Sequence, residues 1–320
     1  MVSGIWTITT ACVHGVGKYP SSTILEKYSH SRLLIIEGLP SICLGLLGLF
    51  YLADSPDKAS YLTCQERDLI QKRRNRDSPE ALTPSAQILH RADVIAAIRD
   101  WRVWAFCVQN FAADIQLFSY AIFLPTIIKA LNAEWSTLRV QALTVPCFVW
   151  SMMVYFAAAF ISDAINRRGV FCFLGAIVCI VGHVMLIAGR NVATTFAGCF
   201  VVATGLFTVS GLALTWLPSN MPRYGKRSTA VGMQLMIGNS AGVAAPYLYP
   251  TTDGPRYVMG HAVTAATLGL SAVITLVLWA AYARSNKRRR EGREDGKMIG
   301  LTEQEIDDLG DESPRFVYTT

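Results

Sequence analysis

The sequence predicts an all-α membrane protein with seven transmembrane helices. Of its 320 residues, 52% are hydrophobic and only 16% are charged, which is too apolar for one soluble domain. A membrane-spanning helix needs roughly 20 mostly apolar residues. Seven stretches meet this requirement: residues 33–52, 104–128, 141–161, 170–189, 193–217, 229–250 and 258–283. The basic residues gather in alternate loops between these stretches, as the positive-inside rule requires of a multi-pass protein.

These spans divide the chain into five parts. They are an atypical N-terminal segment, a single transmembrane helix, a basic linker, a six-helix transmembrane half and a polar tail: residues 1–32, 33–52, 53–99, 100–283 and 284–320. The linker and the tail carry the densest basic clusters, so both are expected on the cytoplasmic side. In the linker, Thr63 and Glu66 form a capping box that predicts a short helix. The tail is acidic around residues 303–312 and is expected to be disordered apart from one short helix near Thr302.

The stretch 105–128 has the length of a membrane span yet carries several polar side chains. Wound as an α-helix, it places them within one arc of roughly 160°: Gln109, Asn110, Asp114, Gln116 and Tyr120. An ionisable group at membrane depth costs several kcal/mol unless it faces protein or a water-filled path. Asp114 is therefore predicted to face the interior and to belong to a functional site. The alternative is a structural polar contact between packed helices.

Two other spans carry polar side chains. In the span 229–250, Gln234 and Asn239 have too much hydrogen-bonding capacity to face lipid, so they could meet Asp114 or a bound solute. An interhelical amide contact is the alternative for either residue. His183, in the span 170–189, is a candidate proton carrier. The alternative is a histidine that is hydrogen-bonded to a neighbouring helix.

The segment 160–169 ends a span with Asp163 and continues four and five residues later with Arg167 and Arg168. Such a cluster could form a charge-assisted latch between helix ends, which would stabilise one orientation of a moving protein. A solvated turn that obeys the positive-inside rule would look the same.

The sequence gives no sign of soluble enzyme chemistry. It has no Walker loop, no GxSxG elbow and no His/Cys set at zinc spacing, so no enzyme activity, metal or cofactor is predicted. The eight cysteines stand mostly singly inside apolar spans and are interpreted as small apolar residues. The net charge of +6 lies in loops beside the spans, so membrane orientation explains it better than nucleic-acid binding.

The run 220–261 resembles the last third of fungal major facilitator transporters of the anion:cation symporter, allantoate permease-like family. The matching residues lie in the family's order and spacing: Lys226, Arg227, Gly238, Asn239, Tyr249, Asp253, Gly254, Pro255, Tyr257, Gly260 and His261. Shorter matches occur at residues 34–40, 54–56, 100–104, 123–126 and 309–311. The resemblance covers roughly residues 32–314.

The resemblance implies that span 33–52 is the family's sixth helix and that the later spans form its C-terminal six-helix half. Segment 160–169 is similar to the superfamily's gate motif, although Ala164 replaces the usual basic residue. By this resemblance the chain is a plasma-membrane, proton-coupled transporter of a small organic anion such as a carboxylate, ureide or vitamin. The part of the solute cavity that belongs to this C-terminal half would be lined by six residues: Gln109, Asn110, Asp114, Gln116, Gln234 and Asn239.

By the same resemblance, we expect this sequence to lack counterparts of the family's first five helices. We therefore expect the 320 residues alone not to transport and to be prone to associate with a second copy. A non-transporting remnant or membrane scaffold is the alternative. A seven-helix receptor fits only the number of spans.

Overall fold

All regular structure in the described part of the chain is helical. The computed structural model describes residues 38–39, 42–48, 59, 61–77, 89–254, 256–302, 305–306 and 309–320. The chain forms two compact units, one of Met1–Pro79 with Trp135–Val145 and one of Glu80–Glu134 with Pro146–Thr320. The predicted N-terminal segment and most of span 33–52 lie outside the described residues, although 38–39 and 42–48 are helical.

In the first unit, the predicted linker helix is present as α3 (Cys64–Asp77). Thr63 and Glu66 form the expected capping box. The Thr63 amide donates to the Glu66 carboxylate at 2.9 Å, and the Glu66 amide donates to Thr63 Oγ1 at 3.4 Å. These contacts satisfy backbone donors that the first turn of a helix leaves unpaired.

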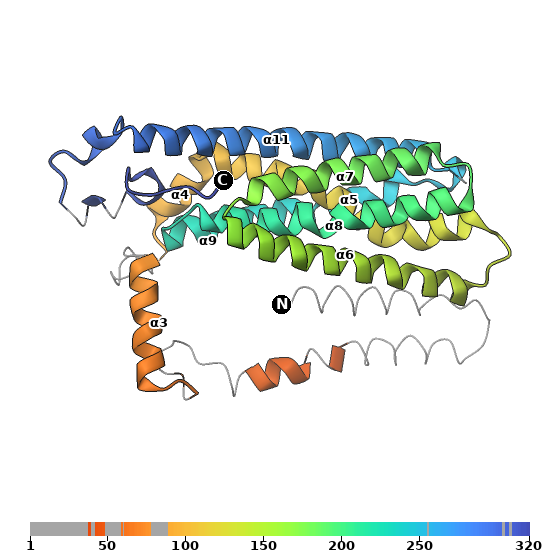
Figure 1. The fold of residues 1–320 in the computed structure, drawn as a ribbon, viewed down its shortest axis with the longest axis horizontal. Coiled ribbons are helices and arrows are strands. Elements are labelled where there is room, and N and C mark those ends of the chain that lie inside the picture. The colour runs from red at the N-terminus through yellow and green to blue at the C-terminus, as the bar shows by residue number, and fades with distance from the viewer. Residues whose placement is uncertain are drawn as a thin grey trace. The chain divides into compact units, whose positions relative to one another are not determined.

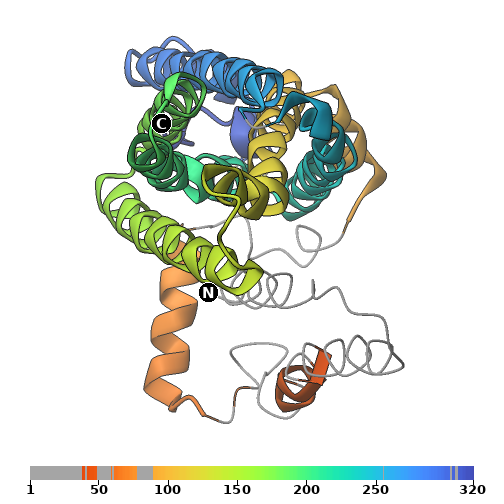
Figure 2. The same cartoon turned by 90° about the vertical axis from the view of Figure 1, so that its right-hand side faces the viewer.

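Five predicted spans are confirmed as long apolar helices (Figure 1). They are α5 (Trp101–Leu131), α6 (Thr137–Ile165), α7 (Arg168–Ala188), α8 (Val192–Ser219) and α11 (Val258–Arg290). The first turns of α6 belong to the first unit, and the remainder of the helix belongs to the second. A short helix, α4 (Arg91–Arg99), precedes α5. Figure 2 shows the helices of the second unit end on, with α11 in blue beside α7 in green.

The predicted span 229–250 is not one continuous helix. It begins earlier, as α9 (Tyr224–Asn239), and is followed by α10 (Ala241–Ala244) and a 3-10 turn, η4 (Ala245–Leu248). A second 3-10 turn, η5 (Thr251–Asp253), comes next. At the break, Asn239 and Ser240 turn their side chains back onto carbonyls of α9, at 2.8 and 2.6 Å. Such bonds compete with helical backbone bonds, so the helix ends there.

Close contact between α7 and α8 depends on glycines. A Cβ atom at Gly205 would lie 2.2 Å from the carbonyl oxygen of Gly175, and one at Gly182 would lie 2.6 Å from the backbone nitrogen of Val202. Small residues let helix backbones approach in this way inside membranes, where van der Waals packing drives association. The α7–α8 pair is therefore closely packed within the second unit.

The expectation of a disordered tail is wrong for residues 310–320. After α11 the chain forms η6 (Asp295–Met298) and η7 (Gly310–Glu312), and its last residues pack against the second unit. Asp311 and Tyr318 are only 4% and 3% exposed, and the Tyr318 ring stacks on Tyr282 of α11 at 4.7 Å. Composition predicts disorder from average polarity, but a few well-placed side chains anchor this segment. Near Thr302, where a short helix is expected, the Thr302 amide donates to the Glu305 carboxylate at 2.8 Å and the Glu305 amide donates to Thr302 Oγ1 at 3.4 Å, as in a capping box.

Candidate functional site

Asp114 lies inside the second unit between three helices. The residue is 5% exposed, and its carboxylate accepts hydrogen bonds from Asn110 Nδ2, at 2.7 Å, and from the Ser210 hydroxyl of α8. Gly238 of α9 lies against both groups. A Cβ atom there would be 2.0 Å from Asn110 Nδ2 and 2.7 Å from Asp114 Oδ2. Asp114 therefore faces the interior, as its arc predicts, and only a glycine allows α9 to approach it so closely.

Gln109 and Gln116 are also buried, at 1% exposure each, but they contact different helices. Gln109 Nε2 donates to Ser271 Oγ of α11 at 3.2 Å. Within the described residues, three polar atoms of this arc have no hydrogen-bond partner: Gln109 Oε1, Asn110 Oδ1 and Gln116 Nε2. Buried polar groups are costly unless paired, so these atoms are available to bind a polar solute or water.

Gln116 begins a chain of polar contacts that crosses the unit. Its side-chain oxygen contacts Nε2 of His183 on α7, and His183 Nδ1 lies 3.1 Å from Nδ1 of His261 on α11. The Tyr249 hydroxyl lies 3.1 Å from the same His261 nitrogen and 3.4 Å from Thr264 Oγ1. His183 is thus hydrogen-bonded to neighbouring helices, which was the structural alternative for this residue.

The structure separates the two polar residues predicted on span 229–250. Gln234 is fully buried and donates to the carbonyl of Ala213 on α8 at 3.2 Å, which is an interhelical amide contact. Asn239 is exposed, and its side chain donates back to its own helix, at the Leu235 carbonyl. Asn239 is therefore not brought to Asp114, and the adjacent Gly238 takes the position beside that carboxylate.

Asp163 and Arg168 form the ion pair that the segment 160–169 suggested, at 2.8 Å. The Arg168 guanidinium also donates to the Thr215 carbonyl and, at 3.0 Å, to the Ser219 hydroxyl of α8. The pair therefore joins the end of α6, the start of α7 and the end of α8. Asp163 is 63% exposed, and such surface pairs contribute only about 0–1 kcal/mol. In the described part of the chain no side-chain partner is seen for Arg167, which directly precedes α7 and makes no side-chain capping bond.

Sequence reasoning missed the residues that complete these clusters. Ser210 and Ser271 are single hydroxyls inside apolar spans, and nothing in their local sequence indicates a carboxylate or amide partner. Tyr249 and His261 lie in the run 220–261, so the resemblance singled them out without giving them a role. Their partners lie far away in sequence, such as Ser210 and Asp114, which are 96 positions apart.

The fold and these buried polar clusters define an integral, multi-pass membrane protein. Residues 1–246 match the family model of the Major Facilitator Superfamily, and the chain belongs to this superfamily. The match includes residues 1–32, which the sequence analysis set apart. Among the residues that the structure describes, no cluster of His, Cys, Asp and Glu could hold a metal ion.

Several fungal proteins are similar to the chain. The "Uncharacterized transporter C1002.16c" of Schizosaccharomyces pombe is 30% identical over 289 residues, which cover 89% of this chain and 56% of that protein. The "High-affinity nicotinic acid transporter" of Saccharomyces cerevisiae is 25% identical over 287 residues, 89% of this chain and 52% of that protein. The "Major facilitator-type transporter hxnP" of Emericella nidulans is 26% identical over 293 residues, which cover 89% of this chain and 57% of that protein. The chain thus spans about half the length of these relatives.

Proposed function

We propose that the chain supplies the Asp114-containing half of a secondary transporter for a small organic anion, with proton coupling at Asp114. The observation that carries the proposal is a buried carboxylate on a helix long and apolar enough to cross a membrane, held by Asn110 and Ser210 and covered by α9 at Gly238. Intramembrane ionisable groups of this kind mark solute and proton paths. The similarity to a nicotinic acid transporter supports a carboxylate as the solute.

The charge of Asp114 provides a physical reason for coupling. An ionised carboxylate repels an anionic solute, and the repulsion is strong where water is excluded. Binding a proton to Asp114 removes the repulsion, so the proton favours the anion and, by linkage, the anion favours the proton. Free polar atoms on Gln109, Asn110 and Gln116 can donate or accept hydrogen bonds to such a solute.

Two further groups complete the proposal. Gln234 is included among the solute-contacting residues because its buried Oε1 has no hydrogen-bond partner among the described residues. Asn239 is exposed and is not included. Asp163, Arg167 and Arg168 are assigned to a latch at the ends of α6, α7 and α8 that opens during the transport cycle.

Uptake into lipid vesicles tests this function. We expect saturable uptake of one or more carboxylates, nicotinate among them, that increases as the outside becomes more acidic. Asp114→Asn keeps the size of the side chain but removes its titratable charge, so it should abolish the pH dependence. Glu134→Gln, on an exposed side chain after α5, is the matched control and should transport as wild type. Unchanged pH dependence in Asp114→Asn would refute the proton role.

The vesicles are prepared with the chain alone and with the chain plus the first half of the yeast nicotinic acid transporter. A major-facilitator solute site lies between two six-helix halves that rock against each other. Uptake is therefore expected only in the second preparation. Saturable uptake by the chain alone would contradict the need for a second half, and no uptake in either would favour the scaffold alternative.

We also propose that the linker and the tail lie on the cytoplasmic side of the plasma membrane, because both are rich in basic residues. Glycosylation acceptor sites inserted into either segment should stay unmodified in cells. An acceptor in the loop between α7 and α8 should be modified, which makes it the matched control. Efficient modification of the tail would reverse the proposed orientation.

A further inference from the structure

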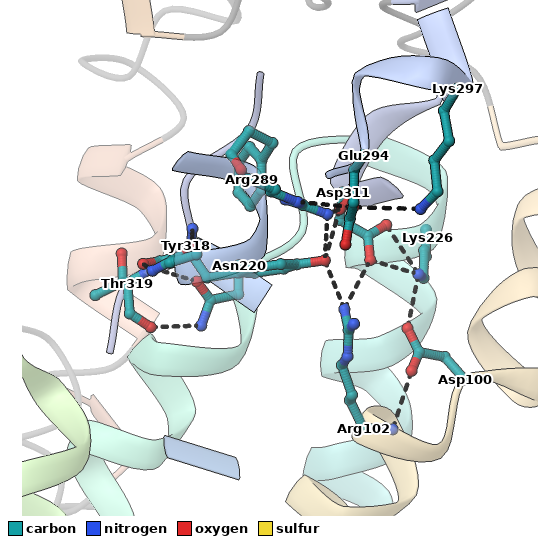
Figure 3. Close-up of polar contacts among 12 residues, drawn as sticks. Asp100, Arg102, Asn220, Lys226, Arg289, Glu294, Lys297, Asp311, Tyr318 and Thr319 are labelled. Atoms are coloured by element: carbon teal, nitrogen blue, oxygen red, sulfur yellow. Dashed lines mark hydrogen bonds and ion pairs between the residues drawn. The ribbon is translucent and has the colours of Figure 1, made fainter. Parts of the chain in front are cut away.

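The last residues of the tail are bound in the way a protein binds an extended peptide (Figure 3). The Asn286 side chain donates to the carbonyl of Tyr318 at 2.8 Å and accepts from its amide at 2.9 Å. Asn220 makes the same pair of contacts with Thr319, at 3.1 and 2.7 Å. The Trp216 indole also donates to the Thr319 carbonyl at 2.8 Å. Two asparagine side chains thus hydrogen-bond the backbone of the tail at successive residues.

The Tyr318 side chain provides the main anchor of this segment. Its ring stacks on Tyr282, and the guanidiniums of Arg102 and Arg289 lie 4.9 and 4.5 Å from the ring centre. The Tyr318 hydroxyl donates to the Asp311 carbonyl and accepts from Arg102, each at 2.6 Å. Burial raises the pKa of Tyr318, so the hydroxyl keeps the proton that it donates. Cation–π contacts and charge-assisted bonds therefore hold the tail at one defined place.

The tail also completes an ion cluster around Lys226, near the start of α9. The ammonium lies 2.7 Å from an oxygen of Asp100 and 2.9 and 3.0 Å from the two oxygens of Asp311 (Figure 3). Burial lowers the pKa of Lys226, but the two carboxylates more than offset this, and the net shift is upward. If the tail dissociated, only Asp100 of these two carboxylates would remain beside the buried ammonium. Docking of the tail thus adds an anchor to this end of α9, beside the ion pair of Arg223 with the buried Asp93 of α4, at 3.1 Å.

The opposite end of α9 touches the Asp114 site. Lys226 and Gly238 are twelve positions apart on one helix, a rise of about 18 Å. Gly238 covers Asn110 and Asp114, and the helix ends immediately afterwards, at Asn239. Ser240 interrupts the helix between α9 and α10, and such an interruption is a point at which a hinge can form. One short helix therefore connects the tail with Asp114.

We propose that residues 310–320 are a releasable clasp that positions α9 over Asp114. The inference rests on the Asp114 site proposed above. Lys226 and the tail are positioning residues, which act on α9 and do not contact the solute. With the clasp docked, Gly238 closes one side of the carboxylate. With the clasp released, α9 moves and Asp114 becomes accessible from that side.

Two measurements on the full chain in lipid vesicles test the clasp, and neither needs transport. Trypsin cleavage after Arg315, followed by the appearance of the peptide 316–320, reports release of the tail. Labelling by a membrane-soluble carbodiimide, read by mass spectrometry at Asp114, reports access to the carboxylate. Asp114→Asn provides the blank for the second measurement.

Asp311→Asn removes the charge that the tail offers to Lys226. The lost charge-assisted bonds should increase the released population, and with it the cleavage rate after Arg315, roughly tenfold. Labelling of Asp114 should rise by a similar factor. Glu312→Gln removes one negative charge at the adjacent, exposed position and is the matched control, with both readouts unchanged.

Tyr318→Ala is the second variant, because it removes the main anchor of the tail without changing the charge of Lys226, Asp100 or Asp311. It keeps the test decisive if Asp311→Asn fails to fold. Faster cleavage with unchanged Asp114 labelling would show that the tail does not position α9, and would overturn the proposal. Unchanged cleavage in the folded variants would overturn it as well, because these contacts would not hold the tail.

Discussion

Gly205→Ala is expected to lower the melting temperature of the chain in detergent by about 10 °C. The added Cβ would lie 2.2 Å from the carbonyl oxygen of Gly175 and 2.6 Å from Cys179 Sγ. The carbonyl belongs to a helix backbone and cannot rotate away as a side chain would. The α7 and α8 helices must therefore separate, and contacts along their whole interface weaken. Such overpacking costs about 3 kcal/mol or more where the backbone itself must shift.

Gly269→Ala is the matched control for this substitution. Gly269 lies on α11, and a Cβ atom there would meet nothing within 4 Å. Alanine is favoured over glycine inside a helix by about 1 kcal/mol, so this variant should melt at the wild-type temperature or slightly above it. Equal melting temperatures for both variants would show that α7 and α8 are not so closely packed.

Lys226→Ala is expected to destabilise the chain by about 3–5 kcal/mol, because it removes the closest cation of two buried carboxylates and leaves Asp311 with Arg102, at 3.5 Å. Asp100 and Asp311 both lie within 3 Å of the ammonium, and their side chains are only 12% and 6% exposed. Lys287→Ala, at a lysine that is 78% exposed, is the control and should change stability little. Equal melting temperatures for the two alanine variants would show that the Lys226 cluster is not needed for stability.

The pH dependence of this contribution follows from the raised pKa of Lys226. A group with a raised folded-state pKa stabilises the protein fully below its unfolded pKa, which is about 10.4 for lysine. The stabilisation is lost only as the pH rises through the higher, folded-state pKa. The difference between wild type and Lys226→Ala should therefore be constant from neutral to mildly alkaline pH. It should shrink only in strong alkali.

Hydropathy alone predicted the positions of the five long helices, because a membrane requires long apolar stretches whatever their tertiary contacts. It failed at α9, where Asn239 and Ser240 end the helix inside an apolar run. The run is apolar on average, so its hydropathy does not reveal that two of its side chains hydrogen-bond carbonyls of their own helix. The polar arc of α5 was predictable for a similar reason, since helical periodicity places Asn110 and Asp114 on one side.

Contacts between distant parts of the chain could not be predicted from one sequence. The meeting of Asp114 with Ser210 and Gly238 depends on how α5, α8 and α9 pack. The docking of the tail depends on Lys226 and Asp311, which lie 85 positions apart. A polar tail and a basic loop look solvated when each is read alone. Their charges match only after folding has brought them together.

Whether Asp114 exchanges a proton inside the membrane decides the proposed function most directly. Infrared difference spectra of the chain in lipid vesicles, recorded between neutral and acidic pH, show the carboxyl groups that gain a proton. Subtracting the spectra of Asp114→Asn from those of the wild type isolates this one side chain. The predicted result is a protonated-carboxyl band that remains after subtraction and reverses when neutral pH is restored. A subtraction that leaves no such band would contradict a proton-carrying role for Asp114.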